Sequence, residues 1–537
     1  MGLRDSLRAL KVFADAGLAR PALPSQLIGM GLAFSRWGIT PAGGWAVGAA
    51  RYPDQPALID ELGTLTFAEV DEMSSAIAAG LVERGIEAGS AVGILARNSR
   101  WAGLSLAALG KAGADAVLLN TGFAAPQLAD VVAREDVRAV VADAEFGPVV
   151  AGLPGSVARY MAWQEPGVRQ AISDAAVSLA ELAGDGGTRP ARPPRPHRRG
   201  RQVLLTSGTT GTPKGAERGV GGPEPGAALL SAIPLRARQT THIASPVFHA
   251  WGLSHLGIGL LLSSTIVLRR RFDPEQTLRL VEQHGVHALV VVPVMLARLL
   301  DLPEAVRRRY DLSTLRVVAV SGAALPAELA LRFMDAFGDV VYNLYGTTEV
   351  AYASVARPAD LREAPGTAGR PLPGAVVRIV DAEGRAVPRG EVGRIFVGNS
   401  MPFSGYTSGE DKERLGSLVS TGDVGYLDRK GRLFVAGRSD DMIVSGGENV
   451  FPAEVEDLLA AHPGVVEAAV IGVADEQMGQ RLLAFVVRRD PALTAGELRE
   501  HVRSHLANYK VPREVRFLDS LPRNAAGKVV KRELVGR

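Results

Sequence analysis

The sequence contains no cysteine. This absence excludes disulfides, thiolate metal sites and an acyl-thioester on the protein itself, so any thiol in its chemistry comes from a substrate. The excess of one sign of charge is also small, because 60 Lys plus Arg against 57 Asp plus Glu leave a net charge of only +3. Nucleic-acid-binding proteins concentrate positive charge far more strongly. We therefore expect no nucleic-acid partner.

Long apolar runs of the kind that enter membranes are missing as well. Charges interrupt the first 20 residues throughout, which is unlike a secretory signal, and we expect a cytoplasmic protein. The stretch 243–268 has no formal charge, but it holds Pro246, His249 and His255, which a bilayer would penalise. We predict a buried helix and then a core strand there. With 537 residues, 47% of them hydrophobic, the chain is long enough for several cores.

The N-terminus has the pattern of an amphipathic helix. Apolar residues recur at helical spacing at Leu3, Leu7 and Leu10, and an adjacent basic stripe is formed by Arg4, Arg8 and Lys11. Such a helix can lie on an anionic membrane surface. An ordinary surface helix has the same pattern and is the favoured interpretation. We keep a peripheral membrane contact through the N-terminus as the alternative among the expected partners.

Short runs rich in Val, Ile and Ala alternate with helical patterns through the first 321 residues. The predicted strands are 91–96, 137–142, 203–206, 288–292 and 317–321, and one intervening helix is 104–112. Strands that alternate with helices indicate parallel sheets. We predict an α/β fold whose large N-terminal domain holds two parallel-type α/β subdomains. The Pro- and Arg-rich segment 189–201 is expected to be an exposed, extended connector.

From about residue 374 the pattern changes to short strands with Gly-rich turns, at 376–380, 394–397 and 433–436, which predicts a β-rich subdomain. A small α+β unit follows, with strands 465–473 and 482–487. Thr494 and Glu497 form a capping box for a helix there. We place the joint in the Gly-rich stretch 437–449. The predicted domains are therefore 1–439 and a mobile C-terminal domain at 440–537.

The strongest single motif is the segment 204–215, LLTSGTTGTPKG. An apolar strand runs directly into a loop whose backbone N–H groups and hydroxyls can face phosphate oxygens, and a lysine closes the loop. It is not a Walker A motif, because Pro213 precedes the lysine and Gly215 follows it. The predicted phosphate-binding residues are Thr206, Ser207, Gly208, Thr209, Thr210, Gly211 and Lys214.

Six further motifs follow in order along the chain. They are SPVFHAWGLSHL at 245–256, SGAALP at 321–326, YGTTE at 345–349, STGD at 420–423, GRSDDMIVSGGENVFPAEVE at 437–456 and LPRNAAGK at 521–528. With the phosphate loop, these motifs resemble the adenylate-forming superfamily of acyl-CoA synthetases, luciferases and peptide-synthetase adenylation domains, and most closely its fatty-acid–CoA ligases. The resemblance covers nearly the whole chain after residue 90.

The chemistry of the motifs agrees with nucleotide binding. Gly322, Ala323 and Ala324 are small enough for an adenine ring to lie against the backbone, although tight loop packing would also select them. Tyr345 offers an aromatic face for stacking. Asp423, in a Gly-containing turn, is suited to accept both ribose hydroxyls, and an ordinary Asp turn is its alternative.

The YGTTE turn, which includes Gly346, carries the groups expected at the phosphates. Thr347 and Thr348 can donate hydroxyls to the α-phosphate, and Glu349 supplies a carboxylate oxygen for Mg2+. By resemblance, Arg438 supports the ribose or the phosphate.

Resemblance also assigns roles beyond the nucleotide. His249 is expected to shape the approach of acyl group and thiol, with general-base work as the less favoured role, and Trp251 to line or gate the acyl pocket. Lys528 would neutralise charge between the attacking carboxylate and the α-phosphate. Asp440 matches the hinge of the mobile domain, and Gly446 and Gly447 match the loop that lines the CoA tunnel after rotation.

These assignments predict an AMP-forming acid–thiol ligase with ATP, Mg2+ and CoA, the last as a substrate. The carboxylic acid is expected to be a medium- or long-chain fatty acid, because the region of Trp251 is apolar. Three alternatives stay open: an acyl-AMP ligase that delivers to a carrier protein, an aryl-CoA ligase, and a catalytically silent lipid-binding relative.

Overall fold

A computed structural model describes most of the chain. The described residues are 3–165, 176–184, 193, 195–206, 214–218, 222–401, 403–407, 409–445, 448–475, 479–525 and 527–535. The chain divides into two compact units. Unit 1 comprises Met1–Val291, Leu302–Val318 and Met401–Asp411, and unit 2 comprises Val292–Asp301, Ala319–Ser400 and Lys412–Arg537. The predicted boundary at residue 440 lies inside unit 2 and stays a prediction.

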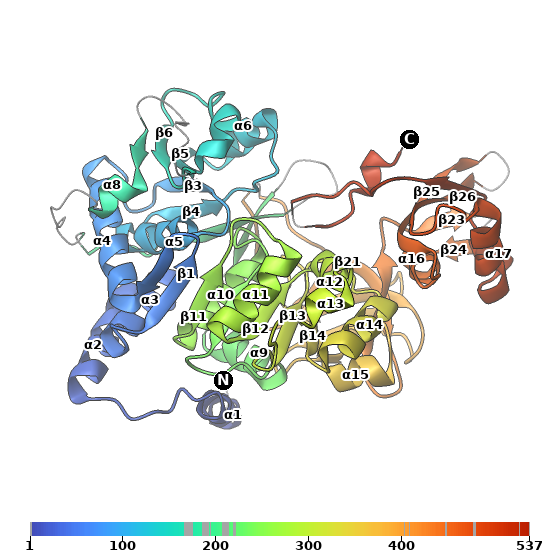
Figure 1. Cartoon of the computed structure of the whole chain (residues 1–537), viewed down its shortest axis with the longest axis horizontal. Coiled ribbons are helices and arrows are strands. Elements are labelled where there is room, and N and C mark those ends of the chain that lie inside the picture. The colour runs from blue at the N-terminus through green and yellow to red at the C-terminus, as the bar shows by residue number, and fades with distance from the viewer. Residues whose placement is uncertain are drawn as a thin grey trace. The chain divides into compact units, whose positions relative to one another are not determined.

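Unit 1 contains an eight-stranded, mainly parallel sheet (Figure 1). Its order is β19 (Phe403–Tyr406), β9 (Lys214–Arg218), β8 (Gln202–Thr206), β4 (Asp115–Leu118), β3 (Ala91–Leu95), β5 (Val137–Ala142), β6 (Ala158–Met161) and β7 (Val177–Ser178). Only β9 pairs antiparallel, with β8 and with β19. The crossovers that parallel strands require hold α5 (Arg100–Ala112) and α6 (Ala125–Arg134). Leu128 and Val131 of α6 pack with Val137 and Val140 of β5.

A second sheet contributes five strands to unit 1. Their order is β12 (Val286–Val291), β10 (Thr240–Ile243), β11 (Thr265–Leu268), β1 (Pro56–Asp60) and β2 (Gly63–Thr66). All these neighbours are parallel except β1 and β2. The stretch 243–268 forms α10 (Ala250–Leu261) and then β11, as predicted. Within the described ranges, none of the helices combines the length and the hydropathy that crossing a bilayer requires.

The remaining helices of unit 1 are mostly short. They are α1 (Leu3–Asp15), α2 (Pro24–Trp37), α3 (Pro41–Arg51), α4 (Phe67–Glu83), α7 (Gly147–Val150), α8 (Leu179–Ala183), α9 (Glu224–Ala232), α11 (Pro274–His284) and α13 (Glu304–Arg307). The connector 189–201, where described, forms neither helix nor strand. The connector is also held to the eight-stranded sheet, because Arg198 and Arg201 both form ion pairs with the buried carboxylate of Asp115 in β4.

Strand β13 (Val317–Val320) is divided between the units, because Val318 belongs to unit 1 and Ala319 belongs to unit 2. The strands that follow it belong mostly to unit 2. Strands β14 (Val341–Tyr345), β15 (Ser354–Ala356) and β16 (Arg370–Pro371) form an antiparallel meander. The predicted β-rich subdomain is an antiparallel sheet of β17 (Val376–Val380), β18 (Gly393–Gly398), β21 (Leu418–Leu427) and β20 (Arg414–Leu415), with β22 (Leu433–Arg438) paired to β21. The helices here are α12 (Pro293–Leu300), α14 (Ala327–Phe337) and α15 (Pro358–Glu363).

The C-terminal part of unit 2 is the predicted α+β domain. Its sheet has the order β24 (Glu448–Val450), β23 (Ile443–Ser445), β26 (Gly479–Arg488) and β25 (Val465–Asp475), and β27 (Glu514–Phe517) pairs parallel with β26. Residues of α16 (Pro452–Ala460) and α17 (Ala495–His505) share one apolar core with this sheet. Figure 1 shows both helices beside its strands. The predicted capping box is present, because Thr494 and Glu497 bond each other's backbone N–H groups. The predicted α/β fold with a separate C-terminal domain is therefore confirmed.

Candidate active site

Strand β14 positions the YGTTE turn by ending at Tyr345. Gly346 follows in a place where only glycine fits, because a Cβ atom there would lie 2.4 Å from the carbonyl oxygen of Ala351. The chain therefore turns at once and carries Thr347 and Thr348 to the end of the strand. Glu349 is only 9% exposed. The turn thus presents two hydroxyls and one largely buried carboxylate in consecutive positions.

Tyr345 is tied to the predicted ribose-binding carboxylate. Its hydroxyl donates to Oδ2 of Asp423 over 2.7 Å. Burial, and then the negative charge of Asp423, raise the pKa of Tyr345 well above its usual value, so the phenol stays protonated and can donate. Two residues that the sequence places 78 positions apart are thereby joined in one hydrogen bond.

Asp423 and Arg438 face each other across β21 and β22, where they are register partners. Nη1 of Arg438 lies 3.5 Å from Oδ1 of Asp423 and donates to the carbonyl of Thr421 over 3.2 Å. On its other side, Nε donates to Oδ1 of Asp440 over 2.9 Å. Burial raises the pKa of Asp423, while Tyr345, Arg438 and Lys528 act in the opposite direction.

Tyr345, Asp423, Arg438 and Asp440 therefore form one chain of polar contacts, here called the Asp423 network. The predicted hinge residue Asp440 belongs to it: although burial acts to raise the pKa of Asp440, the bond to Arg438 lowers it. The carboxylate of Asp440 is therefore ionised at neutral pH. The sequence predicted each member separately, and the structure adds their contacts.

Lys528 lies on a tight loop of unit 2. Its backbone N–H donates to Oδ1 of Asn524 over 2.9 Å, and its carbonyl accepts from the N–H of Asn524 over 2.9 Å. Gly527 has a φ of +79°, and a Cβ there would lie 2.7 Å from Cγ1 of Val294. The loop thus leaves the side chain of Lys528 exposed, and its positive charge acts on Asp423.

The predicted adenine loop follows β13. Gly322 has a φ of +90°, a conformation that favours glycine. Gly322 and Ala324 are exposed and Ala323 is half-buried. The exposure of Gly322 and Ala324 agrees with a loop that a ligand can approach, while a Cβ at Gly322 would lie 3.3 Å from Cγ1 of Val292, so tight packing also favours glycine there.

The phosphate loop is described only at its ends. Thr206 ends β8 and Lys214 begins β9, whereas Ser207, Gly208, Thr209, Thr210 and Gly211 lie outside the described residues. The ammonium of Lys214 forms an ion pair with Glu410, and it lies 5.6 Å from the centre of the Tyr406 ring. Neither neighbour was among the predicted site residues, because both come from the distant segment that β19 brings beside β9. Gly446 and Gly447 also lie outside the described residues.

His249 and Trp251 stand at the start of α10. Nε1 of Trp251 donates to the carbonyl of Val291 over 3.0 Å, and the side chain is buried. The hydrogen bond and the burial therefore fix the orientation of the indole ring. Burial lowers the pKa of His249 to about 4, so the imidazole is neutral at pH 7. Its buried Nε2 has no hydrogen-bond partner within the described residues.

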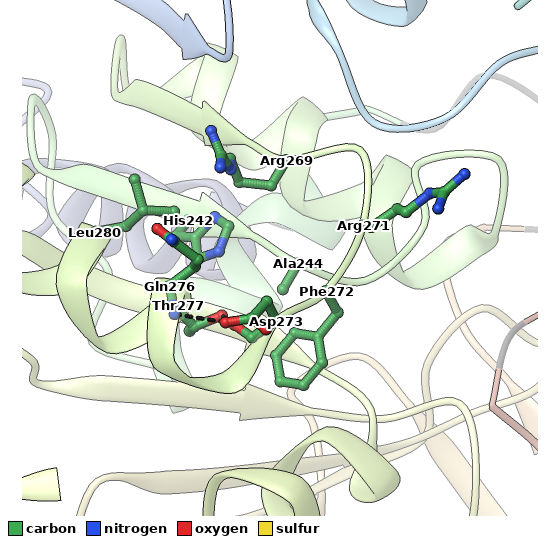
Figure 2. A pocket seen from close by; sticks show the side chains of 9 residues that line it. All are labelled: His242, Ala244, Arg269, Arg271, Phe272, Asp273, Gln276, Thr277 and Leu280. Atoms are coloured by element: carbon green, nitrogen blue, oxygen red, sulfur yellow. Dashed lines mark hydrogen bonds between the residues drawn. The ribbon is translucent and has the colours of Figure 1, made fainter. Parts of the chain in front are cut away.

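A small pocket lies elsewhere in unit 1, beside β10 and the start of α11 (Figure 2). His242, Arg269 and Arg271 line it, and in Figure 2 Asp273 caps α11 by accepting from the N–H of Gln276 over 2.8 Å. Its volume of about 10 Å³ holds roughly one water molecule. It contains no predicted site residue and is too small for a nucleotide.

Comparison with known proteins assigns the family. The model of the AMP-binding enzyme family matches residues 45–407, and that of the AMP-binding enzyme C-terminal domain matches residues 454–528. The chain therefore belongs to the AMP-binding enzymes, the adenylate-forming superfamily predicted from its motifs. It is an ATP-dependent, adenylate-forming acid ligase.

Individual relatives differ in their acids and acceptors. The chain is 32% identical to the fatty acid–[acyl-carrier-protein] ligase ScoC of Streptomyces coeruleorubidus, over 91% of this chain and 94% of the relative. It is 34% identical to the feruloyl-CoA synthase of Amycolatopsis sp, over 92% and 98%. The Bacillus subtilis o-succinylbenzoate CoA synthetase with its acyl-adenylate intermediate is 28% identical, over 91% and 97%, with a TM-score of 0.78.

Proposed function

We propose that this enzyme is an acyl-CoA synthetase that activates a fatty acid. The observation that carries the choice of acid is the uncharged character of α10. Its inner side chains, from Trp251 to Leu260, are buried, and no residue of α10 carries a formal charge. Burial also lowers the pKa of both His249 and His255 to about 4, so neither is a cation at pH 7. A wall of this kind suits an acyl tail without a charged group of its own.

In the proposed first step, a carboxylate oxygen attacks the α-phosphorus of ATP, acyl-AMP forms and pyrophosphate leaves. The Asp423 network holds the ribose through Asp423 and keeps Arg438 beside it. Thr347 and Thr348 donate to the α-phosphate, and Lys214 and the phosphate loop hold the outer phosphates. Lys528 offsets the charge that gathers between carboxylate and phosphate.

The predicted cofactors ATP, Mg2+ and CoA agree with the family, and the solved relatives include a synthetase with ATP and a magnesium ion. Nucleotide-bound Mg2+ takes one or two protein carboxylates and completes its shell with phosphates and water. Glu349, largely buried in the same turn as two threonine hydroxyls, fits that role. When bound, the metal would neutralise charge on the phosphates.

Replacing Glu349 with Gln tests this assignment. We expect adenylation to fall about 10- to 100-fold, as for other metal-site changes, and the half-saturating Mg2+ concentration to rise. Pyrophosphate release measured over a magnesium titration gives both values. A variant whose rate and magnesium response equal those of the wild type would remove Glu349 from the metal site.

In the proposed second step, the C-terminal domain rotates about Asp440, and the CoA sulfur attacks the acyl carbonyl and expels AMP. Asp440→Pro would fix the φ angle of this residue near −65°. We expect single-turnover pyrophosphate release to be spared and thioester formation to slow at least about tenfold, as for a blocked hinge. Chromatography of the CoA product measures the second rate.

Asp440→Asn is the matched control, because it weakens the bond to Arg438 but leaves the backbone free. If both variants slow thioester formation equally, the ion pair matters and the hinge does not.

A panel of carboxylic acids tests the substrate. We expect CoA thioesters from saturated acids of medium or long chain, and little product from aryl acids. Preference for aryl acids would favour an aryl-CoA ligase, and transfer only to a carrier protein would favour an acyl-AMP ligase. Absence of AMP with every acid would indicate a silent lipid-binding relative. A cytoplasmic location and membrane contact through the basic stripe of α1 remain part of the proposal.

A further inference from the structure

Helix α2 exposes large apolar side chains to solvent. Leu23, just before the helix, and Leu27, Ile28, Leu32 and Phe34 within it are between 55% and 67% exposed. Of the fifteen exposed large apolar side chains in the described part of the chain, eight lie between residues 7 and 39. Exposed apolar side chains that gather in one segment indicate an interaction surface.

The inner side of α2 packs against α3. A Cβ at Gly29 would lie 3.0 Å from the Cβ of Ala50 in α3, so the two helices pack closely at that point. Ala33 and Trp37 continue this inner face and join a core cluster with Ala42 and Ala46 of α3. Because Gly29, Ala33 and Trp37 face α3, the side chains of Leu27, Ile28, Leu32 and Phe34 are directed outward.

The segment of the chain that contains α2 is mainly basic. No acidic residue occurs between Asp15 and Asp54. Residues 1–51 contain six basic and two acidic residues, a net charge of +4, although the whole chain has only +3. The rest of the sequence therefore carries −1. Arg36 and Arg199 flank the C-terminal end of α2, where the Arg199 guanidinium lies against Gly38.

We propose that the outer face of α2, with Leu27, Ile28, Leu32 and Phe34, docks on the surface of an anionic lipid bilayer. An apolar helix face inside a basic border is the pattern of a helix that lies in the membrane interface. Its 14 residues extend only about 21 Å, less than the ~30 Å hydrocarbon core, so it lies on the membrane and does not cross it. A second copy of this face would bring two basic borders together, which disfavours self-association.

Helix α1 also exposes apolar and basic side chains. Leu7 and Leu10 are exposed on it, as are Arg8 and Lys11 of the predicted basic stripe. The sequence pattern singled out α1 but not α2, which exposes Leu27, Ile28, Leu32 and Phe34. The inference does not depend on the proposed acid, because binding to vesicles is measured without substrates.

Cosedimentation of the purified full chain with vesicles tests the proposal. The vesicles are phosphatidylcholine alone or mixed with phosphatidylglycerol. We expect the wild type to bind mainly the anionic vesicles, and added salt to weaken binding. The triple variant L27Q/I28Q/L32Q should bind at least tenfold more weakly, since each side chain gives up apolar burial. The charge variant R8E/K11E should lose most of the preference for anionic vesicles.

The matched control is V376Q/V392Q/V466Q, which removes three exposed valines of unit 2 and should bind like the wild type. ATP–pyrophosphate exchange and melting temperature verify that all variants are folded. Wild-type protein that does not bind anionic vesicles, or an α2 variant that binds as tightly as the control, overturns the proposal. So does a wild-type dimer, measured without lipid, that the α2 variant converts to a monomer, because a second copy would then cover the face.

Discussion

Lys528→Ala is expected to slow acyl-AMP formation by about 100- to 1000-fold, the usual cost of removing one placed donor to developing charge. The structure leaves this side chain exposed on the tight loop that follows Asn524, and its charge already acts on Asp423. The proposed role of the lysine ends with adenylation. Given preformed acyl-AMP, the same variant should make acyl-CoA at close to the wild-type rate.

Lys531→Ala is the matched control for this prediction. It removes a lysine three residues further on, whose ammonium lies 2.7 Å from Oε1 of Glu456. We expect both half-reactions to remain near their wild-type rates in that variant. If Lys528→Ala slows the two half-reactions equally, the lysine supports the structure as a whole, and the account of two alternating arrangements loses its main support.

Lys111→Ala is expected to destabilise unit 1 by about 1.5–3 kcal/mol, the usual contribution of hydrogen bonds to a charged group, because the ammonium is buried although its partner Asp71 is 26% exposed. The Lys111 side chain is only 1% exposed and joins α5 to α4. Its ammonium lies within 2.9 Å of four oxygens, those of the Asp71 carbonyl and carboxylate, Ser74 and Ser75. Alanine would leave these oxygens with fewer donors and open a cavity. The thermal unfolding midpoint should fall by several degrees.

Lys430→Ala provides the comparison, because the ion pair of Lys430 with Glu363 is exposed on both sides. Exposed pairs contribute only about 0–1 kcal/mol. The two lysines are therefore expected to differ clearly in calorimetry, although both form ion pairs. Equal midpoints in the two variants would show that the Lys111 cluster is dispensable for stability.

Regular elements with a clear hydrophobic pattern could be predicted closely from the sequence. The strand predicted at 376–380 is β17, and that at 137–142 is β5, each with the predicted limits. The capping box of Thr494 could also be predicted, because its two partners, Thr494 and Glu497, lie within one helical turn. Alternating periods and short-range hydrogen bonds are properties of a segment by itself.

Contacts between distant segments could not be predicted in this way. The pairing of β9 with β19 brings Glu410 to Lys214, and no local pattern marks that register. Tyr345 and Asp423 were each predicted from their own motifs, but their hydrogen bond depends on how β14 and β21 pack. For α2, no local pattern showed which side is inside; the close approach of Gly29 to Ala50 and the burial of Trp37 decide it.

The connection between β22 and β23 sets the length of the tether on which Lys528 is carried. Strand β22 ends at Arg438, and Ser439 is held to the carbonyl of Gly422 by its N–H and its hydroxyl, each over 2.9 Å. Only residues 440–442 then remain before β23 begins at Ile443. Three residues span at most about 10 Å. The segment that begins at β23 and carries Lys528 is therefore joined to β22 by a short connection. In the proposed rotation, the effective concentration of the lysine at the reaction centre therefore stays high, and each return is an intramolecular step whose rate is independent of enzyme concentration.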